Sequence, residues 1–333
     1  MEVTNSNYAA VIVSDCLGIQ PGEEVVIVTD NSKLEITEDL AYCIKEANAK
    51  ISVFYIPENI RPVERITDIH AVSLISADVV IYVLETESNE INLSKETAFR
   101  HYLFTLPVQY KGRVCMMPGF SDQMKDAVAV DYSRIKEKCQ HLKDILTNKI
   151  IRIETDLGTD IEFSLQGRKI EIDDGDITKP GIFGNIPAGE IFTAPVEDTI
   201  NGKIVIDGSI GGLGALKHPF YIELESGKIK DMQPIGEKDE LVDKFREVCE
   251  LDTPATKMVG EFGIGLNPGA KIIGNMLMDE KVEGTVHFAF GDSYGLGKSS
   301  SKFHTDLLIK NPSIFADGRC IMEKGKFILD HLT

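Results

Sequence analysis

The sequence contains no CxxC pair and no cysteines at the close spacing of a metal site, although it has six cysteines in 333 residues. Scattered thiols in a chain of this length are typical of reduced side chains in a cytoplasmic protein. The N-terminal segment also lacks the basic start and the apolar run of a secretory signal. No apolar stretch approaches the roughly 20 residues that a membrane-spanning helix needs. We therefore expect a cytoplasmic protein that has no membrane partner.

Positive charge is scarce as well. The chain has 35 Lys and Arg against 53 Asp and Glu, which leaves a formal charge of −18 and a pI near 4.8. A protein that binds nucleic-acid phosphates needs a basic surface, so this balance argues against a nucleic-acid partner. With 43% apolar and 26% charged residues, the composition is that of a globular protein. The length exceeds the size at which one hydrophobic core stops growing, which predicts two domains.

The first 148 residues alternate between strand and helix patterns, which predicts βαβ units and a largely parallel sheet. A nearly continuous apolar run is typical of a strand that is covered on both faces. The predicted strands are 24–29, 51–56 and 78–84, and the predicted helices are 34–49 and 131–148. We therefore expect residues 1–148 to form an α/β domain.

The pattern changes near residue 149, where short strands separated by glycine-rich turns begin. The predicted strands are 150–155, 160–165, 169–172, 202–206 and 220–224, and the one strong helical pattern is 238–250. Residues 149–333 are therefore predicted to form a β-rich α+β domain. This domain contains every candidate metal ligand.

Candidate metal ligands lie on three predicted strands between residues 258 and 310. His304 and Asp306 are two residues apart, so they share one face of a strand at roughly 6–7 Å along the chain, a spacing at which they can hold one metal. His287 shares its face with a small alanine and is backed by an apolar face. Glu261 alternates with two glycines, and an acid in such a setting is costly to bury unless it is paired or bound to a metal.

Other interpretations of these residues stay open. A His-x-Asp pair also occurs as a surface salt bridge, and a glutamate in a glycine-rich strand is often an edge or turn residue. The Asp-Glu-Lys triplet at 279–281 is interpreted as the close of a turn. The glycine-rich segment 291–299 is not a phosphate loop, because five residues separate its outer glycines where that motif has four.

Several motifs taken together resemble the thermophilic-type metallo-aminopeptidases, the family of aminopeptidases T and S. The similarity covers most of the chain in order, and its most specific part is the Asn-Ile-Pro-Ala-Gly-Glu-Ile-Phe-Thr-Ala-Pro segment at 185–195. The other matching segments are 20–27, Gly260-Glu261, 286–291, Tyr294 and His304-Thr305-Asp306.

The resemblance implies a metal centre built from three carboxylates and two imidazoles, a donor set that suits two divalent ions such as Zn, Co, Mn or Mg. The implied ligands are Glu190, Glu261, His287, His304 and Asp306. Two such ions activate a water molecule and polarise a peptide carbonyl. Glu190 or Glu261 is then expected to carry the proton to the leaving amine, and Tyr294 to donate to the oxyanion.

The same resemblance implies a homodimer that acts on short peptides. The segment 295–303 is shorter than in better-known members, which puts the choice of substrate in question. An Fe(II)-dependent ring-opening dioxygenase for dihydroxypyridine is also similar and uses two histidines and one aspartate, for which His287, His304 and Asp306 would suffice. Glu190 and Glu261 favour the aminopeptidase, because such a triad has no need of further acids. A metal-binding homologue without turnover is the third interpretation.

Overall fold

The structure is a computed structural model that describes residues 7–63, 67–85 and 90–328. The chain divides into two compact units, of which the first is Met1–Tyr132 with Gly175–Ala188 and the second is Ser133–Asp174 with Gly189–Thr333. This division differs from the predicted boundary at 148/149 in two ways. The helix after residue 132 belongs to the second unit, and the segment 175–188 returns to the first.

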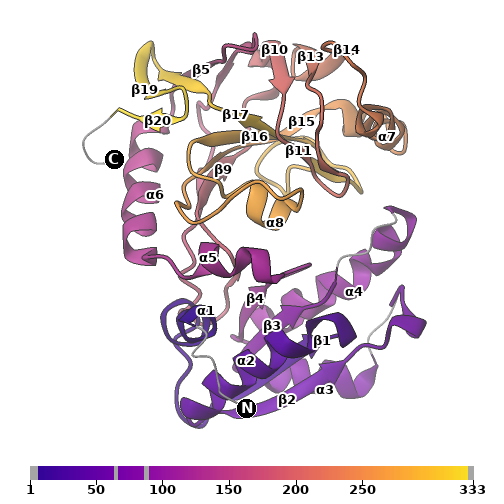
Figure 1. The fold of residues 1–333 in the computed structure, drawn as a ribbon, viewed down its shortest axis with the longest axis vertical. Coiled ribbons are helices and arrows are strands. Elements are labelled where there is room, and N and C mark those ends of the chain that lie inside the picture. The colour runs from indigo at the N-terminus through magenta and orange to yellow at the C-terminus, as the bar shows by residue number, and fades with distance from the viewer. Residues whose placement is uncertain (1–6, 64–66, 86–89, 329–333) are drawn as a thin grey trace. The chain divides into compact units, whose positions relative to one another are not determined.

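The first unit is built on a five-stranded sheet in which every pair of neighbours is parallel, in the order β2-β1-β3-β4-β8. The strands are β1 (Glu24–Thr29), β2 (Lys50–Tyr55), β3 (Val79–Val83), β4 (Arg113–Met116) and β8 (Phe183–Asn185). The helices are α1 (Asn7–Val11), α2 (Leu34–Glu46), α3 (Asp68–Ser76), α4 (Glu90–Gln109) and α5 (Lys125–Val128). The predicted α/β architecture with a parallel sheet is confirmed (Figure 1).

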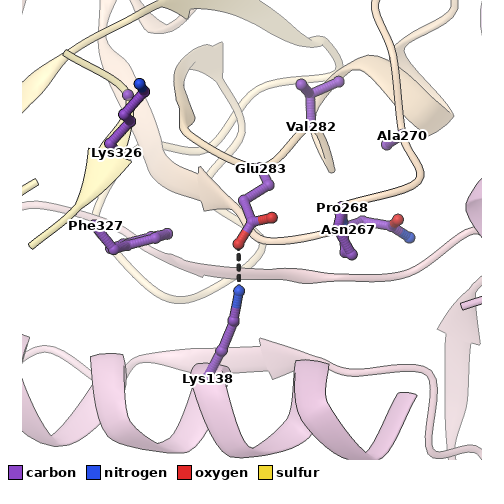
Figure 2. A pocket seen from close by; sticks show the side chains of 9 residues that line it. Lys138, Asn267, Pro268, Ala270, Val282, Glu283, Lys326 and Phe327 are labelled. Atoms are coloured by element: carbon purple, nitrogen blue, oxygen red, sulfur yellow. Dashed lines mark hydrogen bonds and ion pairs between the residues drawn. The ribbon is translucent and has the colours of Figure 1, made fainter. Parts of the chain in front are cut away.

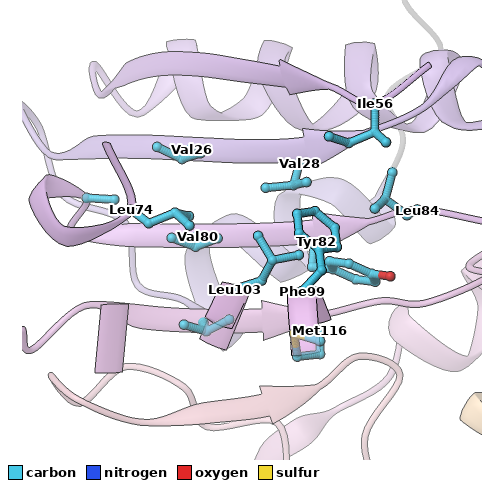
Figure 3. Packing of buried hydrophobic residues seen from close by; sticks show 12 residues of the cluster. Val26, Val28, Ile56, Leu74, Val80, Tyr82, Leu84, Phe99, Leu103 and Met116 are labelled. Atoms are coloured by element: carbon cyan, nitrogen blue, oxygen red, sulfur yellow. The ribbon is translucent and has the colours of Figure 1, made fainter. Parts of the chain in front are cut away.

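The core of the first unit explains why its strands are so uniformly apolar. All five residues of β3 are buried, because this central strand is covered on both faces. On one face, Val80 and Tyr82 pack with Leu74 of α3 and with Phe99 and Leu103 of α4 (Figure 3). Sequence periodicity did not predict α3, α4 or the three-residue strand β8. Pairing with β4 defines β8, and that pairing joins segments about 70 residues apart.

The second unit contains two antiparallel sheets. The eight-stranded sheet comprises β14 (Lys228–Pro234), β13 (Phe220–Glu225), β10 (Asn201–Ile206), β6 (Asp160–Ser164), β5 (Ile150–Glu154), β18 (Ser313–Ala316), β19 (Arg319–Glu323) and β20 (Lys326–Phe327). The seven-stranded sheet comprises β12 (Gly214–Ala215), β11 (Ser209–Ile210), β17 (His304–Lys310), β16 (Thr285–Gly291), β15 (Val259–Gly265), β9 (Glu190–Thr193) and β7 (Glu171–Asp173). The helices are α6 (Tyr132–Leu146), α7 (Glu240–Cys249) and α8 (Met276–Asp279).

An aromatic layer lies on the apolar face of the seven-stranded sheet. The ring of Phe163, from β6, meets the rings of Phe262 and Phe288 edge-on at centroid distances of 4.9 and 5.7 Å. Phe245 of α7 meets Phe290 in the same way at 5.9 Å. Edge-to-face pairs of this kind add about 0.5–1.5 kcal/mol each to the burial of the rings. Since side chains alternate along a strand, packing these phenylalanines fixes the opposite face for the polar residues between them.

No helix in the described ranges is long and apolar enough to cross a bilayer.

Candidate metal centre

The strand register places the predicted acids and histidines on one face of the seven-stranded sheet. Glu261 of β15 lies opposite Ala289 of β16, which lies opposite Asp306 of β17. Directly paired residues of neighbouring strands project to the same side, so the small alanine leaves open space between two carboxylates. His287 belongs to the same face because it is two residues from Ala289.

Gly263 makes room for the imidazole of His287. The two residues are paired across β15 and β16, and a Cβ atom at position 263 would lie 2.2 Å from both Cε1 and Nε2 of the ring. His287 is fully buried, so the ring has no free space into which it can retreat. A glycine at this position is therefore a steric requirement of the site.

A compact loop between β16 and β17 orients His304. The imidazole Nδ1 lies 2.7 Å from the carbonyl oxygen of Asp292, so Nδ1–H is the donor and Nε2 is left to face the acids. The carboxylate of Asp292 accepts hydrogen bonds from the backbone N–H groups of Tyr294 and Ser301 at 2.6 and 3.1 Å. This loop contains the shortened segment 295–303, which is therefore ordered by its own hydrogen bonds.

Imidazole nitrogens and carboxylate oxygens converge on one region. Nε2 of His287 lies 3.3 Å from Oε1 of Glu261 and 3.5 Å from Oε2 of Glu190. Nε2 of His304 lies 3.3 Å from Oδ1 of Asp306 and 3.9 Å from Oε2 of Glu261. In the described part of the chain, Glu261, His287 and Asp306 form a group whose ligand atoms all lie within 4.8 Å of one another.

These donors fit a divalent metal. Oδ1 of Asp306 and Oε2 of Glu190 are buried and accept no well-aligned hydrogen bond from any described residue. Nε2 of His304 carries a lone pair when Nδ1 is protonated, and that lone pair faces the unsatisfied oxygen of Asp306. Two lone pairs that face each other at 3.3 Å repel unless a proton or a metal ion lies between them. Nitrogen and oxygen donors together suit Zn, Mn, Co or Fe(II).

The histidines and acids of the site shift one another's pKa values. Burial alone would lower the pKa of His287, but its hydrogen bond to Glu261 and the negative charge of Glu190 raise that pKa to about 9. Burial would likewise lower the pKa of His304, yet the charge of Asp306 raises it well above its ordinary value. The pKa of Asp306 falls to about 2, because the positive charge of His304 outweighs the effect of burial.

A buried lysine that sequence analysis placed in a turn lies beside this site. The side chain of Lys281 is fully buried, and its Nζ lies 2.5 Å from Oε1 of Glu190, 2.8 Å from Oε1 of Glu280 and 3.0 Å from Oδ2 of Asp173. Asp173 and Glu190 are directly paired across β7 and β9. In the Asp-Glu-Lys triplet, Asp279 ends α8 and accepts hydrogen bonds from the backbone N–H groups of Ile273 and Gly274, and Glu280 and Lys281 form the turn that follows.

The charge of Lys281 is balanced by these acids. Burial by itself would lower the pKa of Lys281, but the charges of Glu190, Glu280 and Asp173 raise it well above its ordinary value. Burial raises the pKa of Glu190 to about 8 in spite of the lysine. No local sequence pattern predicts the role of Lys281. It meets Asp173, Glu190 and Glu280 only because tertiary structure brings β7, β9 and the segment after α8 together.

Tyr294, the predicted oxyanion donor, lies at the exposed edge of the site. Its side chain is 68% exposed, and its ring lies 4.6 Å from the ring of His304 between centroids. Its φ angle of 48° is in the left-handed region, which is uncommon for a bulky residue. The loop is held from outside by Glu197, whose Oε1 accepts the N–H of Lys298 at 2.6 Å and whose other oxygen pairs with Arg168.

A pocket of about 500 Å³ in the second unit is separate from these residues. Figure 2 shows Lys138 of α6 reaching toward Glu283, with which it forms an ion pair. The other lining residues are Asn267, Pro268, Ala270, Val282, Gly325, Lys326 and Phe327. The lining includes none of the predicted ligands, so we do not assign the chemistry to this pocket.

Comparison with known proteins decides the family. A family model described as "NicX: 2,5-dihydroxypyridine 5,6-dioxygenase" matches residues 12–329. The chain belongs to this family. A curated protein of similar sequence, the 2,5-dihydroxypyridine 5,6-dioxygenase of Pseudomonas putida, is 24% identical over 196 residues, which cover 54% of each chain.

The resemblance to the metallo-aminopeptidases is also confirmed. Aminopeptidase AmpS of Bacillus subtilis is 24% identical over 184 residues, which cover 48% of this chain and 43% of AmpS. The chain thus matches about half the length of each of these curated relatives.

Two solved structures share the fold over nearly the whole chain. The 2,5-dihydroxypyridine dioxygenase of Pseudomonas putida KT2440 has a TM-score of 0.78 at 16% identity and covers 99% of this chain and 100% of its own. AmpT of Thermus thermophilus has a TM-score of 0.76 at 14% identity and covers 98% and 99%. The comparisons support a metal-dependent enzyme on this fold and are divided between two reactions.

Proposed function

We propose that this chain is a single-metal dioxygenase that opens a small dihydroxylated heteroaromatic ring. The proposal rests on a difference between the carboxylates of the site, since Asp306 faces the histidines and Glu190 is paired with a lysine. His287, His304 and Asp306 direct two imidazole nitrogens and a carboxylate oxygen toward one region, whereas Oε1 of Glu190 is engaged by Lys281. Two histidines and one carboxylate with open positions are the donor set of non-haem Fe(II) oxygenases.

In the sequence, Glu190 and Glu261 favour a peptidase, because a triad of two histidines and one aspartate needs no further acid to bind Fe(II). The contact of Glu190 with Lys281 at 2.5 Å gives Glu190 a structural role as the partner of a buried cation. Membership of the dioxygenase family over residues 12–329 supports the same choice.

The residues of the site have distinct roles under this proposal. His287 and His304 would bind Fe(II) through Nε2, and Asp306 through a carboxylate oxygen. When bound, the ion would supply open coordination positions and the redox chemistry that O₂ activation needs. Glu261 lies next to both histidines, where it can take the proton from the substrate hydroxyl. Tyr294 lies against His304 at the exposed edge, where it can contact the ring of the substrate.

The proposal is tested by measuring both reactions on one preparation. Protein purified without oxygen is loaded with Fe(II) and assayed for O₂ uptake with 2,5-dihydroxypyridine. The same apoprotein is loaded with Zn, Co or Mn and assayed for the hydrolysis of aminoacyl anilides. We expect O₂ uptake that is lost in Asp306→Asn and kept in His218→Ala, a partly exposed histidine that pairs with Glu237. Anilide hydrolysis without O₂ uptake would contradict the proposal.

An aminopeptidase is the second candidate, and Glu261 is the observation that favours it. Oε1 of Glu261 lies 3.3 Å from Nε2 of His287 and its Oε2 lies 3.9 Å from Nε2 of His304, an arrangement suited to a bridging carboxylate. Under this candidate, Glu190→Gln or Glu261→Gln would abolish hydrolysis while metal is retained, which would identify the proton shuttle. Short peptide substrates and a homodimer stay predictions of this candidate.

A further inference from the structure

Three carboxylates from three different places in the chain surround one point of the second unit. Asp173 comes from β7, Glu190 from β9 and Glu280 from the turn after α8. Buried carboxylate oxygens that converge on one point are suitable ligands for a divalent cation. In this chain the point is occupied by Nζ of Lys281, within 3.0 Å of all three.

Glu190 connects this point to the metal centre. Its Oε1 contacts Lys281 at 2.5 Å, and its Oε2 lies 3.5 Å from Nε2 of His287. The carboxylate is thus placed between a fixed ammonium group and the proposed metal, in the way that a bridging carboxylate is placed between two ions. Oε2 accepts no hydrogen bond from any described residue, so it remains available to the metal.

We infer that Lys281 is a built-in replacement for a second metal ion, so that the chain binds one divalent ion where sequence analysis predicted two. The ammonium group repels any cation at the position that it occupies, and its buried side chain fills the space. This inference rests on the single-metal site of the proposed function, and it is tested by counting bound ions without measuring the reaction.

The number of bound ions is measured on apoprotein titrated with Mn²⁺. Elemental analysis and calorimetry give the stoichiometry, and electron paramagnetic resonance distinguishes an isolated Mn²⁺ from a coupled pair, since two ions in a shared site lie about 3.5–4 Å apart. We expect one ion per wild-type chain and an uncoupled spectrum. Two ions or a coupled spectrum in the wild type would overturn the inference, whatever activity the protein has.

Removing the lysine tests the inference in the other direction. Lys281→Ser opens space among three uncompensated acids, so we expect a second equivalent of Mn²⁺, a coupled spectrum, and a melting temperature that is low without metal and recovers with Mn²⁺. Lys281→Arg keeps the charge and is expected to keep one ion. A folded Lys281→Ser variant that still binds one ion would overturn the inference. If that variant does not fold, the wild-type stoichiometry decides by itself.

A matched control is available in the first unit. Lys33 is also buried, and among the described residues the carboxylate that it pairs with is that of Glu85, at 2.6 Å. Lys33→Ser also removes a buried ammonium group, and no cluster of three acids surrounds it in the described part of the chain. We expect it to lose stability without gaining a metal ion, and a gain of Mn²⁺ by this variant would show that the effect is unspecific.

Discussion

Gly263→Ala offers the sharpest test of the metal centre, because its effect follows from one distance. The added methyl group would lie 2.2 Å from Cε1 and Nε2 of His287, whereas ordinary contacts begin at 3.4 Å. The ring or the strand must therefore move by at least about 1.2 Å. Metal–ligand distances tolerate changes of only about 0.2 Å. His287 is fully buried, so the strain cannot be relieved toward solvent.

Two quantities are expected to change in this variant. Changes in the surroundings of a metal ligand already cost roughly 10–100-fold in affinity, and displacing the ligand itself should cost about 100-fold or more, or about 2.8 kcal/mol. Overpacking of the strand pair should lower the free energy of unfolding by about 1–3 kcal/mol. Calorimetric titration of the apoprotein with Mn²⁺ measures the first quantity, and urea denaturation measures the second.

The control for this experiment is Gly318→Ala. Gly318 has a positive φ of 80° and no neighbour within 4 Å of an added Cβ, so the variant should lose about 1 kcal/mol through backbone strain alone. Its affinity for Mn²⁺ should equal that of the wild type. A folded Gly263→Ala variant that binds Mn²⁺ within a factor of three of the wild type would refute the steric argument.

Three further predictions follow from the same site. The pKa of His287 is about 9 in the folded protein and 6.5 ordinarily, so its proton stabilises the folded apoprotein by about 3 kcal/mol below pH 6.5. This stability is lost as the pH rises through 9. Urea denaturation should show a smaller loss of stability between these pH values in His287→Gln. Glu197→Gln should cost roughly 2–3 kcal/mol by removing the carboxylate partner of Arg168, and should speed hydrogen exchange of the 293–301 amides; unchanged exchange would show that Glu197 does not hold the loop. Tyr294→Ala removes the ring that would contact the substrate and should lower kcat/KM roughly tenfold with the metal content unchanged, whereas Tyr294→Phe should keep it; equal kcat/KM in Tyr294→Ala would remove Tyr294 from the mechanism.

Local patterns predicted the strands of the site well. The segments 259–265 and 285–291 alternate polar and apolar residues, and this alternation alone assigns Glu261 and His287 to the faces on which the structure has them. The prediction holds because a strand repeats every two residues whatever its neighbours are. The parallel sheet of the first unit was predictable for a similar reason, since its buried strands are short apolar runs between helices.

Contacts between distant segments were not predictable in this way. The boundary at 148/149 missed the return of 175–188, because β8 has three residues and is defined only by its pairing with β4. The Asp-Glu-Lys triplet was interpreted as one turn. The backbone of Glu280 and Lys281 does form a turn after α8, but the side chain of Lys281 is buried against acids from β7 and β9, which no local pattern predicts.

The sequence by itself determined which residues have the chemistry of a metal site and which of them share a face of a strand, because both properties are local. Tertiary structure decided which of those residues face the proposed metal and which pair with Lys281. The register of β7, β9 and β15 brings Glu190 to a buried lysine on one side and to His287 on the other. Because these acids are buried, each needs a positive partner, since an unpaired charge is costly only where water is excluded.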